Sequence, residues 1–321
     1  MSKRREVADS INYQKALGID ITALKAFGES RTRAELASVA VAFLRNIDRV
    51  IHTLALPVYL IFWAKNTQIS ECVAYFTITG DVRPKSPPDK ETYDKCAAEN
   101  LRLHIEWLKT READPFPNSE FGRASNAITG AIMDGGTASV AGFRAMLVNA
   151  LVGTWTAFET LSGDLWEAAL NCHPHELSQF NGKPKGHEEW KVASGYLHKH
   201  GYDLTKVVGT VLKNQKRYSF GQLSDIKKAY KHAFSKGIKD IDAIIGSDLR
   251  ALEVVRNLLV HRAGIVDEKF IGETKNMPRF SGLKVNDELP MTGDLVATLL
   301  SSTIGSSLEL YSEVERWLAS H

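Results

Sequence analysis

The chain has 321 residues, with 40 Lys and Arg against 38 Asp and Glu, so its formal net charge is +2 at pH 7. This length suffices for one large domain or two modest ones, each able to bury a core. Hydrophobic residues make up 44% and charged residues 24%, as in an ordinary soluble globular protein. The near-neutral charge excludes a nucleic-acid surface that depends on overall basicity, so any such surface has to be a local patch.

The cysteines and the N-terminus indicate a reducing compartment. Cys72, Cys96 and Cys172 are odd in number, far apart and without a Cys-x-x-Cys pair, which argues against a disulfide framework. The first residues are positively charged, but no apolar run follows them, so no secretory signal is expected. The most apolar stretch, 54–64, is interrupted by Pro57 and shorter than the ~20 residues of a membrane span, so we interpret it as buried core. We therefore expect a cytoplasmic protein without membrane contact.

The first 135 residues are expected to form a mainly helical region of unknown role. Apolar residues recur at helical spacing through 31–54, and Pro57 is expected to bend or restart the chain. Residues 73–80 are rich in β-branched and aromatic side chains and fit either a short strand or a helix end. Ser86, with the two prolines after it, predicts the start of a helix that reaches Lys109.

The best boundary between two domains lies at 134–136, Asp-Gly-Gly, which ends a shorter predicted helix over 119–133. The predicted domains are therefore 1–135 and 136–321. The second opens with a long helix over 139–170, whose apolar residues form one broad face.

Near the C-terminus, residues 283–291 are expected to form a small hairpin or loop. Thr292 is expected to cap a final helix that runs from Gly293 to Leu318.

The stretch 248–264 combines a strong helix pattern with a cluster of polar side chains. Ser247 or Asp248 can cap its start, and Gly264 stands where a left-handed residue usually ends a helix. A core-facing stripe runs along one side of this helix, made of Leu252, Val255, Leu258 and Leu259. The opposite stripe carries Arg250, Glu253, Asn257 and His261, with Arg256 at its edge.

Arg256 and His261 are five positions apart, roughly 140° around an ideal helix, so one straight helix does not aim both at a single atom. They converge if the helix unwinds near Gly264 or if a two-fold partner brings its own copies across a shared cleft. The alternative is a solvated helix face whose late cations, Arg256, His261 and Arg262, offset the negative end of the helix dipole.

The order Arg256-Asn257, then three apolar residues, then His261, resembles the motif of HEPN domains. The upstream helix 144–166, with Glu159 directly after Phe158, also resembles an earlier core helix of that family. The resemblance covers about residues 136–321, and it is moderately specific only when both helices are counted. It implies an all-α fold, namely a HEPN-like helical bundle with an additional N-terminal helical region.

The resemblance to active HEPN ribonucleases implies metal-independent cleavage of RNA by its own 2′-hydroxyl, leaving a 2′,3′-cyclic phosphate, in a cleft shared by two protomers. Histidine can transfer protons near neutral pH, and arginine stabilises phosphoryl charge. We therefore expect a homodimer in which Arg256 binds the phosphate and His261 transfers protons. Asn257 is expected to orient the His261 ring or to hold the phosphate. Glu159 and Arg144 are supporting candidates, for which an ordinary ion pair with another helix is an equal alternative. No cofactor is expected.

Family members often act as toxins or phage-defence effectors, some restrained by a partner protein such as an antitoxin, and the same biology is expected here. The alternative to the enzyme is a non-catalytic HEPN-like module that binds RNA or another protein. A plain helical scaffold with a fortuitous motif is the third interpretation.

The strongest local basic patch lies within 213–239, where aromatic residues are interleaved with the cations. This combination suits phosphates and stacked bases, although a solvated helix face is more common. The RNA-binding candidates are Lys213, Lys216, Arg217, Lys227, Lys228 and Lys231.

A second cluster, Cys172-His173-Pro174-His175 with further histidines downstream, suggests zinc, but its spacing fits no common site, so no metal is predicted.

Overall fold

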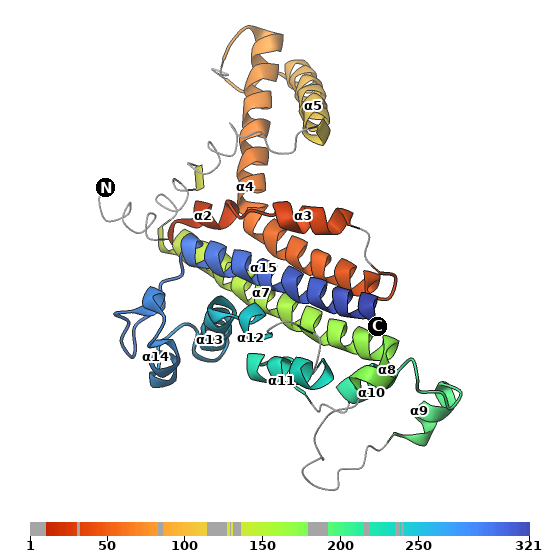
Figure 1. Ribbon diagram of the computed structural model, residues 1–321. Coiled ribbons are helices and arrows are strands. Elements are labelled where there is room, and N and C mark those ends of the chain that lie inside the picture. Colours follow the sequence, from red (N-terminus) through yellow and green to blue (C-terminus); the bar gives the residue numbers. More distant parts are fainter. Residues whose placement is uncertain are drawn as a thin grey trace. The chain divides into compact units, whose positions relative to one another are not determined.

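The computed structural model describes residues 11–30, 33–82, 86–113, 127–128, 130, 136–178, 192–214, 218–234, 238 and 241–321 (Figure 1). The protein is all-α, which confirms that part of the predicted fold class. Over the ranges just given, β pairing is limited to one isolated antiparallel bridge between Ile265 and Glu288. The stretch 283–291 is thus a loop with this single bridge. The predicted helix 119–133, apart from residues 127, 128 and 130, lies outside the described residues.

The chain forms two compact units that are interleaved in sequence. The first comprises residues 1–14 and 52–144, and the second comprises residues 15–51 and 145–321. This division runs differently from the one predicted at residue 135, because residues 15–51 pack with the C-terminal part. Phe27 packs edge-on against Tyr311, with ring centroids 4.8 Å apart, and the backbone N–H of Arg33 donates to Glu315 at 3.1 Å.

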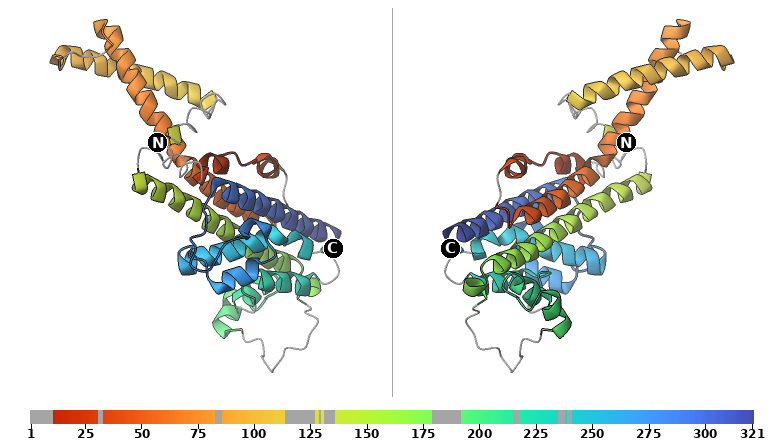
Figure 2. Two further views of the ribbon diagram at one scale, coloured as in Figure 1. Left: turned by 90° about the vertical axis from the view of Figure 1, so that its left-hand side faces the viewer. Right: turned by 90° about the vertical axis from the view of Figure 1, so that its right-hand side faces the viewer.

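The first unit is built on the second part of α4 (Ala37–Thr79) and on α5 (Lys90–Ala113), which are drawn in orange and yellow in Figure 2. Helix α4 continues through Pro57, so the chain does not restart there, which was one of the two expected outcomes. Residues 73–79 are helical and not a strand, and Gly80, at φ +77°, ends the helix. The cap of α5 is Asp89 and not the predicted Ser86, because the Thr92 backbone N–H donates to Asp89 Oδ1 at 2.8 Å.

The predicted burial of 54–64 is wrong for one face of α4. Leu54 and Val58 are buried, but Leu60 and Trp63 are 56% and 55% exposed. By length and composition alone α4 is also apolar enough to cross a membrane, although core helices of soluble proteins pass the same test. A helix with few neighbours leaves apolar side chains at the surface, as α4 does here.

The second unit is organised around α7 (Gly136–Cys172) from residue 145 onward, α15 (Gly293–Ser320) and the first part of α4, which are long rods in Figures 1 and 2. Helix α7 packs closely on α4, since a Cβ on Gly153 would lie 2.8 Å from Val50 Cγ2. Helix α13 (Ser247–Arg262) packs against α15 and α14 (Glu268–Thr274).

The remaining described helices are short, except α11. They are α2 (Tyr13–Leu17), α3 (Thr22–Glu29), α8 (Pro174–Leu177), α9 (Ser194–Lys199), α10 (Val208–Asn214), α11 (Leu223–Ala233), α12 (Ile241–Ile244) and the 3-10 turn η1 (Pro278–Phe280).

Three predicted helices of this unit are confirmed. The helix predicted over 139–170 is α7, the one over 248–264 is α13 and the one over 293–318 is α15. Thr292 caps α15 as predicted, because its hydroxyl accepts from the Leu295 N–H at 3.2 Å. The predicted side-chain cap of α13 is absent, because Gly246 is its N-cap residue. Its left-handed end begins one residue early, at Ala263 (φ 51°), and continues at Gly264 (φ 84°).

Candidate functional site

Helix α13 positions the three predicted catalytic side chains. All four residues of its predicted core stripe, Leu252, Val255, Leu258 and Leu259, are buried. The predicted polar face is not uniformly solvated, because Glu253 is buried, pairs with Arg250 and accepts a hydrogen bond from the Leu223 backbone N–H at 2.8 Å. These contacts fix the rotation of α13, and with it the directions of the side chains one turn further on.

Arg256 is held between an aromatic ring and an amide. Its Cζ lies 6.0 Å from the ring centroid of Trp155 on α7, within cation–π range, and one terminal N–H donates to Asn257 Oδ1 at 3.0 Å. Its Nε is buried without an acceptor, and no carboxylate pairs with it in the described part of the chain. A half-buried guanidinium with an unused donor is suited to binding an anion.

His261 is exposed and lies in a different environment. Together with Asn257 it lines a hollow of about 220 Å³ against α14, to which Asp267, Phe270 and Glu273 also contribute. Its imidazole has no hydrogen-bond or ion-pair partner among the residues that the structure describes. The ring is therefore accessible to a ligand.

A single chain does not bring Arg256 and His261 to one point, as the helical spacing predicted. Arg256 does not line the hollow of His261, and Asn257 is the residue that takes part in both environments. The helix does not unwind before His261, since the Gly264 N–H closes the C-terminal turn by donating to the Leu258 carbonyl at 3.3 Å. Unwinding near Gly264, one of the two predicted routes to convergence, is therefore not seen in this structure.

Glu159 lies one helical turn after Trp155 on α7 and is half-buried. Its Oε1 would be 3.4 Å from a Cβ on Gly221, and no described residue forms an ion pair with it. The alternative of an ordinary ion pair is therefore not seen for Glu159. Arg144 belongs to the first compact unit.

Salt bridges neutralise most of the basic patch that is described. Lys213 bridges Asp164 at 2.6 Å and Glu167 at 2.9 Å. Burial alone would lower the pKa of Lys213, but the hydrogen bonds to these two carboxylates outweigh burial and raise it.

The other lysines of the patch are divided. Lys227 and Lys231 both pair with Asp242, whereas Lys228 is exposed and has no ion pair in the described ranges. Lys216 and Arg217 lie outside those ranges.

Most of the aromatic residues interleaved in the patch do not form a stacking surface, and Phe220 is half-buried. Tyr218, Tyr230 and Phe234 are all buried, and the Tyr230 hydroxyl donates to the Ser162 carbonyl at 2.8 Å. These rings belong to the core of the second unit, so they are not free to stack on bases.

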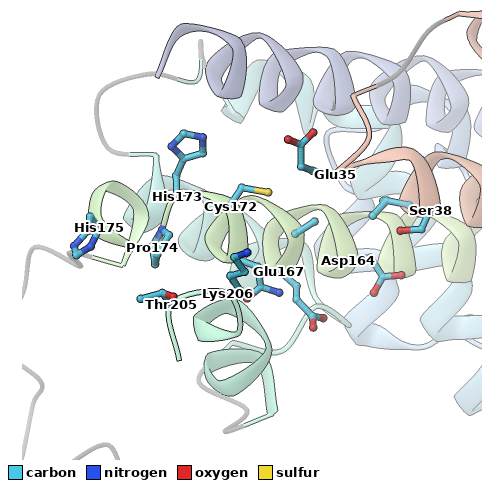
Figure 3. A pocket seen from close by; sticks show the side chains of 13 residues that line it. Glu35, Ser38, Asp164, Glu167, Cys172, His173, Pro174, His175, Thr205 and Lys206 are labelled. Atoms are coloured by element: carbon cyan, nitrogen blue, oxygen red, sulfur yellow. The ribbon is translucent and has the colours of Figure 1, made fainter. Parts of the chain in front are cut away.

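A larger cavity, of about 940 Å³, contains the residues of the zinc alternative (Figure 3). Cys172, His173 and His175 line it together with Glu35, and the two imidazole rings lie apart on either side of Pro174. Burial, then the nearby Glu35 carboxylate, raises the pKa of the Cys172 thiol, which disfavours the thiolate that a metal requires. Within the described ranges no three His, Cys, Asp or Glu side chains are grouped to hold a metal ion.

Comparisons with protein-family models, with curated proteins and with solved structures find no match for this chain. The assignment of a function therefore depends on the residues themselves.

Proposed function

We propose that the protein is a HEPN-like, metal-independent endoribonuclease that acts as a homodimer. The bundle of α7, α11, α13 and α15 would be the HEPN-like part, and RNA would be the substrate. As a toxin or phage-defence effector it would be restrained by a regulatory protein or antitoxin until needed.

The observation that carries the proposal is the state of Arg256. Arg256 is half-buried, held by Trp155 and Asn257, and has no carboxylate partner among the described residues; such a guanidinium is typical of a site for an external anion. In the transition state of RNA cleavage, this group would stabilise the charge that accumulates on the phosphoryl oxygens.

His261 would supply the proton transfer. The 2′-oxygen of RNA forms a bond to phosphorus while the bond from phosphorus to the 5′-oxygen breaks. His261 of one protomer would accept the 2′-hydroxyl proton or protonate the 5′-oxygen, and its symmetry mate would take the other task. Asn257, which lies between the two environments, would orient both groups.

Substitution of either residue tests the proposal. We expect Arg256→Ala and His261→Ala each to lower the rate of RNA cleavage by at least ~10²-fold, because a proton-transfer group typically contributes ~10²–10⁴-fold. The rate is measured with purified protein on labelled RNA in the presence of chelator, which should have no effect. His198→Ala, an exposed histidine on α9, is the matched control and should cleave normally.

The second candidate function is a non-catalytic interaction module. The exposed apolar residues of α4, among them Leu60 and Trp63, favour it, as do the neutralised lysines of the basic patch. If the purified protein leaves RNA intact, and if Arg256→Ala and His261→Ala behave as wild type in cells, this candidate replaces the nuclease.

A further inference from the structure

Two neighbouring side chains of the second unit, Trp155 and Arg256, each have a buried N–H donor with no acceptor among the described residues. Trp155 is completely buried, and neither its indole Nε1 nor the Nε of Arg256 has a hydrogen-bond partner in the described part of the chain. The two side chains are in contact range, with the Arg256 Cζ 6.0 Å from the Trp155 ring centroid. Buried donors in native proteins nearly always have a partner, so two unpaired donors at one place call for an explanation.

Trp166, on the same helix α7, is a comparison for an indole that has only a structural role. It is as fully buried as Trp155, and its Nε1–H donates to the Ala229 carbonyl at 3.1 Å. Among the described residues, the fold supplies an acceptor for Trp166 and none for Trp155. This contrast indicates that the acceptor for Trp155 comes from outside the chain.

The donors define the chemistry of that acceptor. Arg256 carries a permanent positive charge, which favours an anionic oxygen over a neutral one. The amide oxygen of Asn257 already accepts from Arg256, so its N–H₂ group remains as a third donor. Charged and neutral N–H donors on neighbouring side chains suit a tetrahedral oxyanion such as a phosphoryl group, whose several oxygens can each accept one hydrogen bond.

We infer that Trp155 and Arg256 form one oxyanion-binding site, in which the indole Nε1–H and the guanidinium Nε–H donate to oxygens of a phosphoryl group. The partly exposed side of Arg256 is the route of entry, and a rotation of its guanidinium opens the buried Nε. The assignment of that group to an RNA phosphodiester rests on the proposed function, whereas the site itself does not.

A pair of tryptophan substitutions tests the site. Trp155→Phe and Trp166→Phe remove the same atoms from the same helix, but only Trp155 is inferred to donate to the anion. Titration calorimetry with inorganic phosphate should show binding to the wild type that Trp155→Phe weakens by about tenfold or more, since hydrogen bonds to charged groups are the stronger kind. Trp166→Phe should bind phosphate as the wild type does.

Melting temperatures without phosphate provide the second measurement. Trp166→Phe should lower the melting temperature more than Trp155→Phe, because only Trp166 loses a hydrogen bond within the fold. A larger loss for Trp155→Phe would overturn the inference, since the indole would then have an internal acceptor. Absence of phosphate binding by the wild type, or equal binding by Trp155→Phe, would overturn it as well.

A third titration separates this inference from the nuclease proposal. RNA with 2′-O-methyl groups cannot be cleaved, and it should bind with the same dependence on Trp155 if the ligand is a phosphodiester. If inorganic phosphate shows the Trp155 dependence while no RNA is bound or cleaved, the oxyanion site stands and the ribonuclease proposal fails.

Discussion

Helices α4 and α7 have a similar apolar composition, but they differ in how far their side chains are buried. Both are long and rich in apolar residues, 43 and 37 residues respectively. In the second unit α7 buries Trp155, Phe158 and Trp166 completely, whereas in the first unit α4 leaves Trp63 55% exposed. The difference lies in how many helices pack around each one, so apolar composition alone does not determine burial.

Helix α4 itself has buried apolar side chains in one part and exposed ones in another. Phe43 and Ile47, in its first part, are buried in the second unit, while Leu60 and Phe76, further along, are more than half exposed in the first unit. The same helical pattern therefore contributes to a core in one unit and to a surface in the other.

The largest expected effect on stability comes from truncating one aromatic residue in each of these two helices. Phe158→Ala should reduce the free energy of unfolding by about 3–5 kcal/mol, because it leaves a cavity in a closely packed core. Trp63→Ala should cost less than about 1 kcal/mol, because surface substitutions rarely cost more. Urea unfolding followed by circular dichroism measures both, and equal losses would mean that the face of α4 is packed in solution.

A smaller effect is expected for ion pairs in the two units. Lys213→Met should lower the free energy of unfolding by about 1–2 kcal/mol, since it leaves Asp164 and Glu167 together in a partly buried position. Arg102→Met removes an exposed pair of bridges, to Glu99 and Glu106 on α5, and should change stability too little to measure. A larger loss for Arg102→Met than for Lys213→Met, in the same urea titration, would reverse this order.

The smallest expected effect is the loss of stability of helix α5 at low pH. Hydrogen bonds from the Thr92 backbone N–H and side chain lower the pKa of Asp89. A carboxyl group with a lowered folded-state pKa stabilises the helix above the unfolded-state pKa, and this stabilisation is lost as the pH falls through the folded-state pKa. The NMR signal of the Thr92 amide should shift over that range. The shift should disappear in Asp89→Asn, which still caps but does not titrate, and its persistence there would show that another group causes it.

The features that the sequence predicted well are those that depend on neighbouring residues. The apolar stripe of α13 repeats within a few turns, and the cap formed by Thr292 joins residues three positions apart. The separation of Arg256 from His261 likewise follows from helical spacing alone.

Other features depend on residues far apart in the sequence and could not be predicted. Glu253 is buried because it accepts from Leu223, thirty positions earlier, and Lys213 is neutralised by carboxylates on α7. In the sequence Trp155 is only one apolar position of a long helix, because nothing local indicates that its indole has no acceptor among the described residues. The contrast with Trp166, which finds its acceptor 63 positions later in the sequence, exists only in three dimensions.

The interleaving of the two units has a consequence for the integrity of the molecule. Residues 15–51 and 145–321 together form the second unit, and residues 52–144 stand between them in the chain. A single backbone cut anywhere in that intervening stretch leaves each fragment with part of one shared core. The nicked halves would stay associated under native conditions and separate only in denaturant.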